Sequence, residues 1–145
     1  MAPVIATIEI DRPAEDVFDY VTNPSRFHEW QKGVVSGEMA TAGPTAVGER
    51  CLTTRQIGLA KRPSTSQVSH VDPPRTWGVR GIDGPIRAIV DVTVKPLDDT
   101  RSHLTISVDF TGHGIGKALV PLVVRREAQK EMPANLAKAK LRLEA

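Results

Sequence analysis

The chain has 145 residues, of which 40% are hydrophobic, 25% charged and 4% aromatic. This composition is typical of a globular protein and excludes disordered, collagen-like and coiled-coil architectures. Nineteen Lys and Arg against seventeen Asp and Glu give a formal net charge of +2, an excess too small to indicate a nucleic-acid partner. We expect residues 1–145 to form a single domain.

Three features of the sequence bear on the compartment in which the protein acts. Cys51 is the one cysteine, so no disulfide can form within the chain. The opening MAPVIATIEIDRP lacks the basic start and long apolar core of a secretion signal. No apolar run is long enough to form an integral membrane segment. We expect a cytoplasmic protein that is a monomer or a homodimer.

The first 30 residues predict one strand and two short helices. Residues 4–10, VIATIEI, alternate in polarity and are rich in β-branched side chains, which indicates a strand. Apolar residues from Ala14 to Val21 then recur at i, i+3, i+4 and i+7, which indicates a helix. Pro24 ends this helix, and Ser25 to Trp30 form a second helical turn capped by Ser25.

The middle of the chain has the pattern of an antiparallel sheet. Segments rich in Val, Ile and Thr alternate with turn clusters such as VDPPRT and IDGP. No helical pattern interrupts them, which excludes parallel crossovers and doubly wound folds. We predict six further strands, at residues 34–40, 47–57, 63–72, 75–82, 86–96 and 101–111.

The last segment, residues 116–143, predicts a long helix. Its apolar stripe at helical spacing consists of Leu119, Leu122, Val123, Met132, Leu136, Ala139 and Leu143. Pro121 fits a first turn, whereas Pro133 falls inside the helix and is expected to kink or divide it.

These elements predict an α+β helix-grip fold, in which a seven-stranded curved antiparallel sheet wraps around the long C-terminal helix. An antiparallel sheet with one wet face must bury the other, and the terminal helix is the one predicted element large enough to cover it. The two short helices after the first strand close one end. The space between sheet and helix is then an apolar cavity suited to a small hydrophobic ligand.

Strand alternation selects the side chains that we expect to line this cavity. Trp30 and Trp77 matter most, since large flat rings suit a planar ligand, although both fit equally well as plain core residues. The candidate ligand contacts are Phe27, Trp30, Trp77, Val79, Val90, Val92, Ile106, Val108, Leu122 and Met132.

The sequence also resembles a known superfamily. Residues 5–30, IATIEIDRPAEDVFDYVTNPSRFHEW, resemble the opening of the START-related helix-grip (SRPBCC) superfamily. Gly48 to Arg50, then VSHVDPPRTW at 68–77 and RREAQKEMPANLAKAKLRLE at 125–144, extend the likeness over nearly the whole chain. It is most similar to small polyketide cyclase/dehydrase-like proteins common in actinobacteria. The superfamily includes lipid carriers, hormone receptors, cyclases and small toxins, so the resemblance implies the fold more than the activity.

Several local patterns have plain explanations. The segment GHGIGKA, residues 112–118, is one residue too short for a phosphate loop and lacks its hydroxyl residue. The four histidines are not paired at ligand spacing, so we expect no metal and no cofactor. Basic charge gathers at Arg50, Arg55, Lys61 and Arg62, which we interpret as solvated surface or, alternatively, as an attraction for an acidic ligand at the cavity rim.

Three functions from different classes remain open. The first is a non-enzymatic binder of a small hydrophobic molecule such as a lipid, isoprenoid or polyketide. The second is a polyketide cyclase or dehydratase, which needs a base and an oxyanion donor. Its candidate catalytic groups are His70, Tyr20 and Arg55, and the face that His70 occupies depends on the register of its strand. The third is a protein-interaction or toxin-type member, which only the resemblance suggests.

Overall fold

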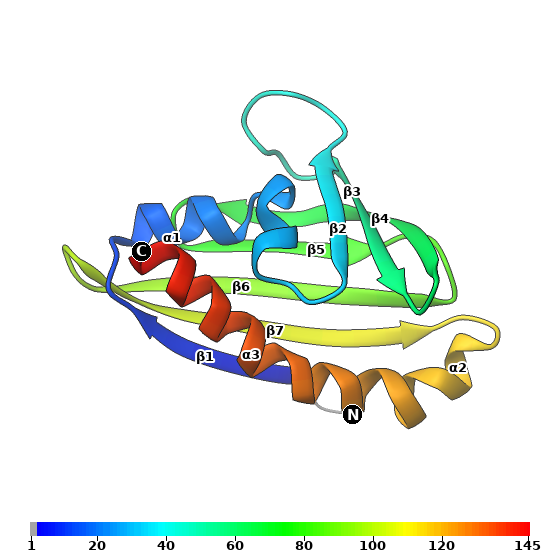
Figure 1. Cartoon of the computed structure of the whole chain (residues 1–145). Helices are drawn as coiled ribbons and strands as arrows, with labels where there is room; N and C mark the ends of the chain where they lie inside the picture. The colour runs from blue at the N-terminus through cyan, green and yellow to red at the C-terminus, as the bar shows by residue number, and fades with distance from the viewer. Residues whose placement is uncertain (1–2) are drawn as a thin grey trace.

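The computed structural model describes residues 3–145, apart from the side chains of Ile57 and Leu122. A strongly curved antiparallel sheet forms the body of the molecule, and the C-terminal helix packs along its concave side next to the first strand (Figure 1). The strand order is β1-β7-β6-β5-β4-β3-β2. The predicted α+β helix-grip fold is therefore confirmed.

The elements follow the predicted order. The seven strands are β1 (Val4–Ile10), β2 (Val34–Met39), β3 (Arg50–Ile57), β4 (Ala60–Asp72), β5 (Thr76–Gly81), β6 (Ile86–Asp98) and β7 (Arg101–Gly112). The helical elements are α1 (Ala14–Val21), the 3-10 helix η1 (Pro24–Glu29), α2 (Gly116–Leu119), the π-helical turn η2 (Val120–Val124) and α3 (Arg125–Glu144).

Strand boundaries differ most at β3 and β4. β3 begins at residue 50 rather than 47, and β4 begins at 60 rather than 63. β4 starts early because a two-residue turn, Gly58–Leu59, connects the strands, with Ile57 paired to Ala60. Gly58 has φ +61°, a left-handed conformation that suits this tight turn.

Pro133 does not divide the last helix, so that alternative of the prediction is wrong. α3 continues through it from residue 125 to 144. A proline removes one backbone hydrogen bond, and here the buried side chains of Met132 and Leu136 hold both sides of that position against one core.

The irregular helical segment lies further upstream, at η2, which contains Pro121. A π-helical turn adds residues per turn and so shifts the phase of the side chains that follow. Leu119 and Val123 are exposed and Val120 is buried, so the predicted apolar stripe is wrong at Leu119 and Val123. The Leu122 side chain lies outside the described part of the chain.

A β-bulge decides the orientation of His70. Val68 pairs with Val79 and Val71 pairs with Trp77, while the register shifts between Val68 and His70. The extra residue allows both valines to face the concave side, because a bulge interrupts strict alternation. His70 therefore points to the convex side, and regular alternation could not have turned Val68 and Val71 inward together.

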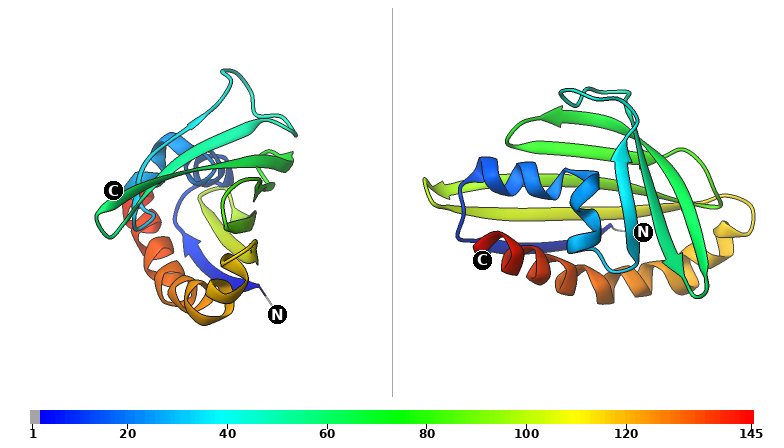
Figure 2. Two further views of the ribbon diagram at one scale, coloured as in Figure 1. Left: turned by 90° about the vertical axis from the view of Figure 1, so that its right-hand side faces the viewer. Right: turned by 45° about the horizontal axis from the view of Figure 1, so that its top comes forward.

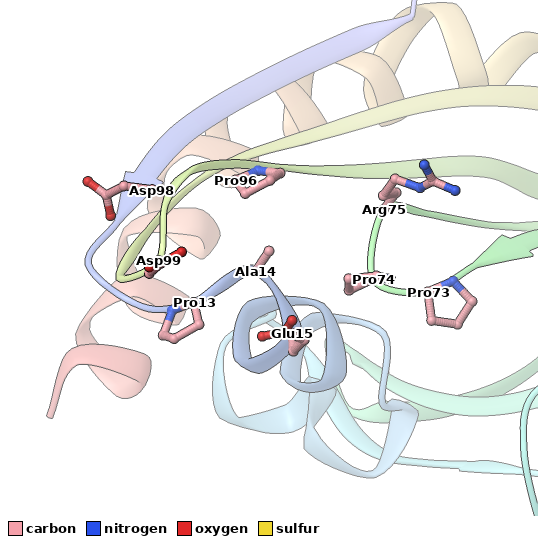
Figure 3. A pocket seen from close by; sticks show the side chains of 9 residues that line it. All are labelled: Pro13, Ala14, Glu15, Pro73, Pro74, Arg75, Pro96, Asp98 and Asp99. Atoms are coloured by element: carbon pink, nitrogen blue, oxygen red, sulfur yellow. The ribbon is translucent and has the colours of Figure 1, made fainter.

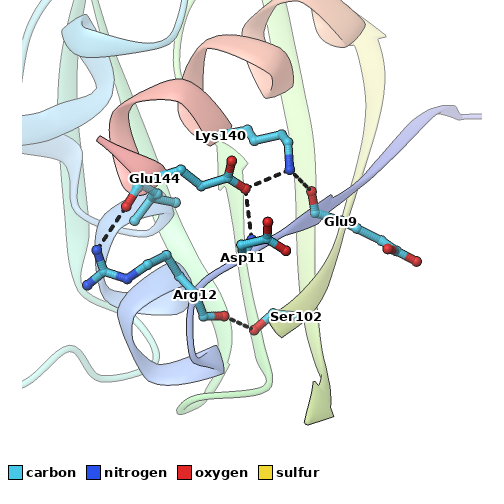
Figure 4. A network of polar contacts seen from close by, with 7 residues as sticks. Glu9, Asp11, Arg12, Ser102, Lys140 and Glu144 are labelled. Atoms are coloured by element: carbon cyan, nitrogen blue, oxygen red, sulfur yellow. Dashed lines mark hydrogen bonds and ion pairs between the residues drawn. The ribbon is translucent and has the colours of Figure 1, made fainter. Parts of the chain in front are cut away.

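A polar clasp fastens the end of α3 to the turn after β1 (Figure 4). Arg12 Nη1 donates to the Leu143 carbonyl at 2.9 Å, and Glu144 Oε2 accepts from the Asp11 amide at 2.8 Å. Lys140 Nζ donates to the Glu9 carbonyl at 2.8 Å. These contacts satisfy helix-end and turn groups that would otherwise lack partners.

Ser102 supports this clasp from β7. Its side chain is fully buried and donates to the Arg12 carbonyl at 2.7 Å. Replacing Ser102 by Ala leaves that carbonyl without its partner, so we expect the free energy of unfolding to fall by about 1–3 kcal/mol. Ser107→Ala, on the convex side of the same strand, should change it by less than about 0.5 kcal/mol. Urea denaturation of both variants measures the difference, and equal effects would contradict it.

Candidate functional site

The concave face is packed at one end and open at the other. On β6, Val92 and Val94 are buried, and on β7 Leu104 and Ile106 are buried. Further along the same strands, inward-facing apolar side chains are only half-buried, although their neighbours across the strands continue the same row. We call this region the open half of the concave face; its residues are Ile86, Ala88, Val90, Val108, Phe110 and, on α3, Ala128.

Aromatic rings fill the packed half. Phe27 meets Trp30 edge-on with ring centroids 6.0 Å apart, and it meets Trp77 at 6.3 Å. All three are buried in the core. Edge-to-face pairs of this kind hold η1 firmly against the sheet. The Trp30 indole Nε1 is buried without a hydrogen-bond partner in the described structure.

The structure places the predicted ligand contacts in two groups. Val90 and Val108 lie in the open half, where a ligand has access. The other described candidates are core residues: Phe27, Trp30, Trp77, Val79, Val92, Ile106 and Met132. Leu122 cannot be placed, because its side chain is not described. A role for any of these residues in ligand contact stays a prediction.

Arg55 differs from the other basic residues of its segment. It shares the concave face of β3 with Cys51, and its Nη2 donates to Gln31 Oε1 at 3.3 Å. Part of the side chain remains exposed, yet burial by surrounding protein lowers the pKa of its guanidinium, with Glu131 of α3 acting in the opposite direction. An arginine still carries its charge at neutral pH. Arg55 is thus an exposed cation that faces the concave side, and both interpretations of this basic segment stay predictions.

His70 is separated from the open half by the sheet itself. Its Nε2 lies 2.7 Å from Asp91 Oδ1 on the convex side. The imidazole crosses over Gly78, where an added Cβ would be 2.3 Å from Nε2. The pair needs this glycine, because any side chain there would displace the ring. The candidate role of His70 as a base in the cavity does not fit this position.

Tyr20 is held in its neutral form. Its hydroxyl donates to Glu29 Oε1 at 3.1 Å, and Glu29 is also paired with Arg26 at 2.8 Å. Burial, together with the hydrogen bond and charge of Glu29, raises the pKa of Tyr20 from its usual 10.0 to about 12. A phenol with this pKa is a poor general base at neutral pH, so Tyr20 does not fit that candidate role either.

Because Tyr20 is the only tyrosine in the chain, tyrosinate absorbance reports its ionisation directly. We expect a midpoint near pH 12 in the folded protein and near 10 in urea. Since folding raises the pKa of Tyr20, the protonated phenol contributes to the free energy of unfolding below pH 10. This contribution is lost as the pH rises towards 12. Glu29→Gln should move the folded midpoint part of the way down, because burial remains. An unchanged midpoint in that variant would contradict the role of Glu29.

Some inward polar groups were not predicted. Gln31, between η1 and β2, and Glu131 of α3 approach Arg55, which no local sequence pattern could indicate. Glu49 has a buried Oε2 without a partner in the described structure, and the alternation of β3 was the one available signal for its direction. Cys51 is a buried free thiol, and burial raises its pKa.

Two concavities lie elsewhere on the surface. One, of about 590 Å³, lies over β2, β3 and β4. The other, of about 450 Å³, lies between the start of α1 and two hairpins (Figure 3). Four prolines line the second one, together with Glu15, Asp98 and Asp99. Neither includes a predicted ligand contact.

The described residues contain neither a cluster of metal ligands nor a membrane-spanning helix. Among residues 3–145, no three His, Cys, Asp or Glu side chains gather closely enough to hold a metal ion. No helix in the same range is long and apolar enough to cross a membrane.

A family model described as polyketide cyclase/dehydrase and lipid transport matches residues 1–144. The chain belongs to this family. Membership agrees with the resemblance seen in the sequence, and it implies ligand binding in a hydrophobic cavity. A search among curated proteins finds no match.

Solved structures share the family fold at low sequence identity. A START superfamily protein from Mycobacterium smegmatis has a TM-score of 0.78 at 15% identity, covering 99% of this chain and 98% of its own. The Zhui aromatase/cyclase from Streptomyces sp. R1128 has a TM-score of 0.77 at 16%, covering 98% and 93%. A polyketide-cyclase-like protein from Corynebacterium glutamicum has 0.69 at 22%, covering 98% and 91%. These likenesses show the fold alone.

Proposed function

We propose that this protein binds a small hydrophobic molecule, such as a lipid, isoprenoid or polyketide, at the open half of the concave face. The observation that carries the proposal is the row of inward aliphatic and aromatic side chains that α3 leaves half-buried, Val90, Val108 and Phe110 among them. A ligand that covers exposed apolar surface on this concave face is stabilised by about 25 cal/mol for each Å² of apolar surface removed from water.

The distribution of charge supports an apolar ligand. The inward positions of β6 and β7 from Ile86 to Val94 and from Leu104 to Phe110 carry no charged side chain. The cation that approaches this face, Arg55, comes from β3. We propose that the protein acts in the cytoplasm as a monomer or homodimer and that the ligand needs no cofactor.

Matched substitutions on one strand test this site. Ala88 faces the open half, and its neighbour Ile89 faces the convex side. We expect Ala88→Phe to weaken binding of cis-parinaric acid at least about tenfold, because the ring occupies ligand space. Ile89→Phe should leave the affinity within about twofold. Fluorescence titration gives both values, and thermal unfolding verifies that each variant is folded.

Equal affinities for the two variants would contradict this location. Native mass spectrometry of protein purified from its own host, followed by solvent extraction, identifies what the site retains. An empty protein that also ignores a panel of lipids would contradict the binding function itself.

A second function, cyclisation or dehydration of a poly-keto substrate, is favoured by Arg55. A cation on the same face as an apolar site, with its guanidinium pKa lowered by the surrounding protein, can stabilise the enolate that forms during aldol cyclisation. Gln31 fixes its direction. No general base is assigned, and chain folding within the site would supply part of the rate.

Arg55→Gln tests the enzyme alternative. With a poly-β-ketone substrate, we expect turnover to fall by about 10²-fold or more if Arg55 stabilises the enolate. His70→Gln should leave turnover unchanged, because His70 lies on the convex side. Product analysis by chromatography measures both. Equal rates for Arg55→Gln and the unmodified protein would exclude this role and favour a carrier.

A further inference from the structure

Three connections lie at the end of the sheet where the open half lies. They are the turn between β3 and β4 at 58–59, the hairpin between β5 and β6 at 82–85, and the segment between β7 and α2 at 113–115 (Figures 1 and 2). Two of them touch, since the His113 amide donates to the Pro85 carbonyl at 2.8 Å. We call these connections, together with the helical residues to 126, the loop end.

Aliphatic side chains project from the loop end into solvent. Leu59, at the tip of a two-residue turn, is fully exposed, and Ile115 is 72% exposed. Val123 of η2 is 50% exposed. Two-residue turns ordinarily hold Gly, Asn or Asp, so a leucine at this tip gives the folded chain no packing benefit. Its apolar surface is available to an external partner.

The loop end is also strongly basic. The loop end and the residues directly beside it, 55–62, 80–87 and 112–126, contain eight Lys and Arg and a single acidic residue, Asp83. Two of the eight are engaged elsewhere, since Arg125 is ion-paired with Asp109 and Arg55 donates to Gln31. Asp83 is engaged in the hairpin, where its Oδ1 accepts from the Thr65 amide at 2.9 Å. Lys61 and Lys117 are both exposed.

The opposite end of the sheet has the reverse charge. Its connections, residues 9–16, 72–75 and 98–101, contain seven acidic and three cationic side chains. The connections at the two ends of the sheet thus carry opposite net charges, although the formal net charge of the whole chain is only +2. Such a charge distribution orients a protein as it approaches an anionic surface.

We propose that the loop end docks on the surface of an anionic lipid bilayer. Aliphatic tips on separate connections can each enter a fluid interface, whereas a protein partner would need a separate pocket for each of them. Lys61 and Lys117, both exposed and each two residues from an aliphatic tip in the sequence, supply the cations that headgroup phosphates attract. The inference rests on the proposed function in one respect: docking brings the open half to the membrane, so an apolar ligand passes between bilayer and site without crossing water.

Vesicle flotation tests the docking surface. The unmodified protein should float with phosphatidylcholine vesicles that contain about one third phosphatidylglycerol, and much less with pure phosphatidylcholine. Lys61→Gln with Lys117→Gln should weaken this binding roughly 30-fold at low ionic strength, since each lysine near an anionic surface contributes about fivefold. The matched control is Lys95→Gln with Lys138→Gln, two exposed lysines away from the loop end, which should change it less than about threefold.

Leu59→Asn tests the aliphatic contribution without disturbing the turn, because Gly-Asn suits a two-residue hairpin. We expect binding to the same vesicles to fall roughly tenfold. Leu141→Asn is the matched control, since Leu141 is 73% exposed on the last turn of α3, beside the polar clasp. Binding of cis-parinaric acid in solution, measured in parallel, should be the same in both variants.

The two readouts separate the two proposals. Vesicle binding that fails while cis-parinaric acid binding persists would overturn the docking surface and leave the proposed function standing. Equal losses in the Lys61/Lys117 and Lys95/Lys138 pairs would also overturn it. A protein that ignores anionic vesicles but binds poly-glutamate through Lys61 and Lys117 would overturn the membrane assignment and indicate an acidic protein partner instead.

Discussion

The length of concave sheet that α3 can cover is the constraint on which the rest of the structure depends. The buried stripe of α3 runs from Met132 to Leu143, and there the facing side chains of β6 and β7 are buried as well. Between Val120 and Met132 the described side chains of the helical segment offer only Ala128 to the main core, and Leu119 and Val123 are exposed. The inward face of the strands continues beyond the point at which the helix stops covering it, and that difference creates the open half.

The same constraint explains why the two ends of the molecule differ. At the packed end, the clasp between the turn after β1 and the end of α3 fixes the helix, and Phe27, Trp30 and Trp77 fill the remaining space. At the other end, three connections surround the uncovered apolar face. The fully buried core therefore lies mainly in one half of the sheet, while Val90, Val108 and Ala128 of the open half pack only at its margin.

The candidates for acid–base chemistry are distributed in a way that favours binding. His70 pairs with Asp91 behind the sheet, and Tyr20 is kept protonated beside Glu29. Arg55 is the one sequence-predicted catalytic candidate that approaches the concave face, and a cation alone can stabilise a developing negative charge but cannot remove a proton at neutral pH. A carrier needs neither function, whereas a cyclase would depend on the substrate's own reactivity for the proton transfer.

Periodicity in the sequence determined the order of strands along the chain, the helix positions and the fold class. Alternation and helical spacing are properties of consecutive residues, so they are visible in the sequence itself. Tertiary structure decided what spacing cannot encode. The bulge beside Val68 turned His70 outward, the core on both sides of Pro133 kept α3 continuous, and the π-helical turn exposed Leu119 and Val123. In the sequence Arg55 is one of four similar basic residues. Only the structure distinguishes it from the other three, because it brings Gln31 and Glu131 from distant parts of the chain close to Arg55. Side-chain direction at an irregular position depends on long-range packing, and a single sequence does not contain that information.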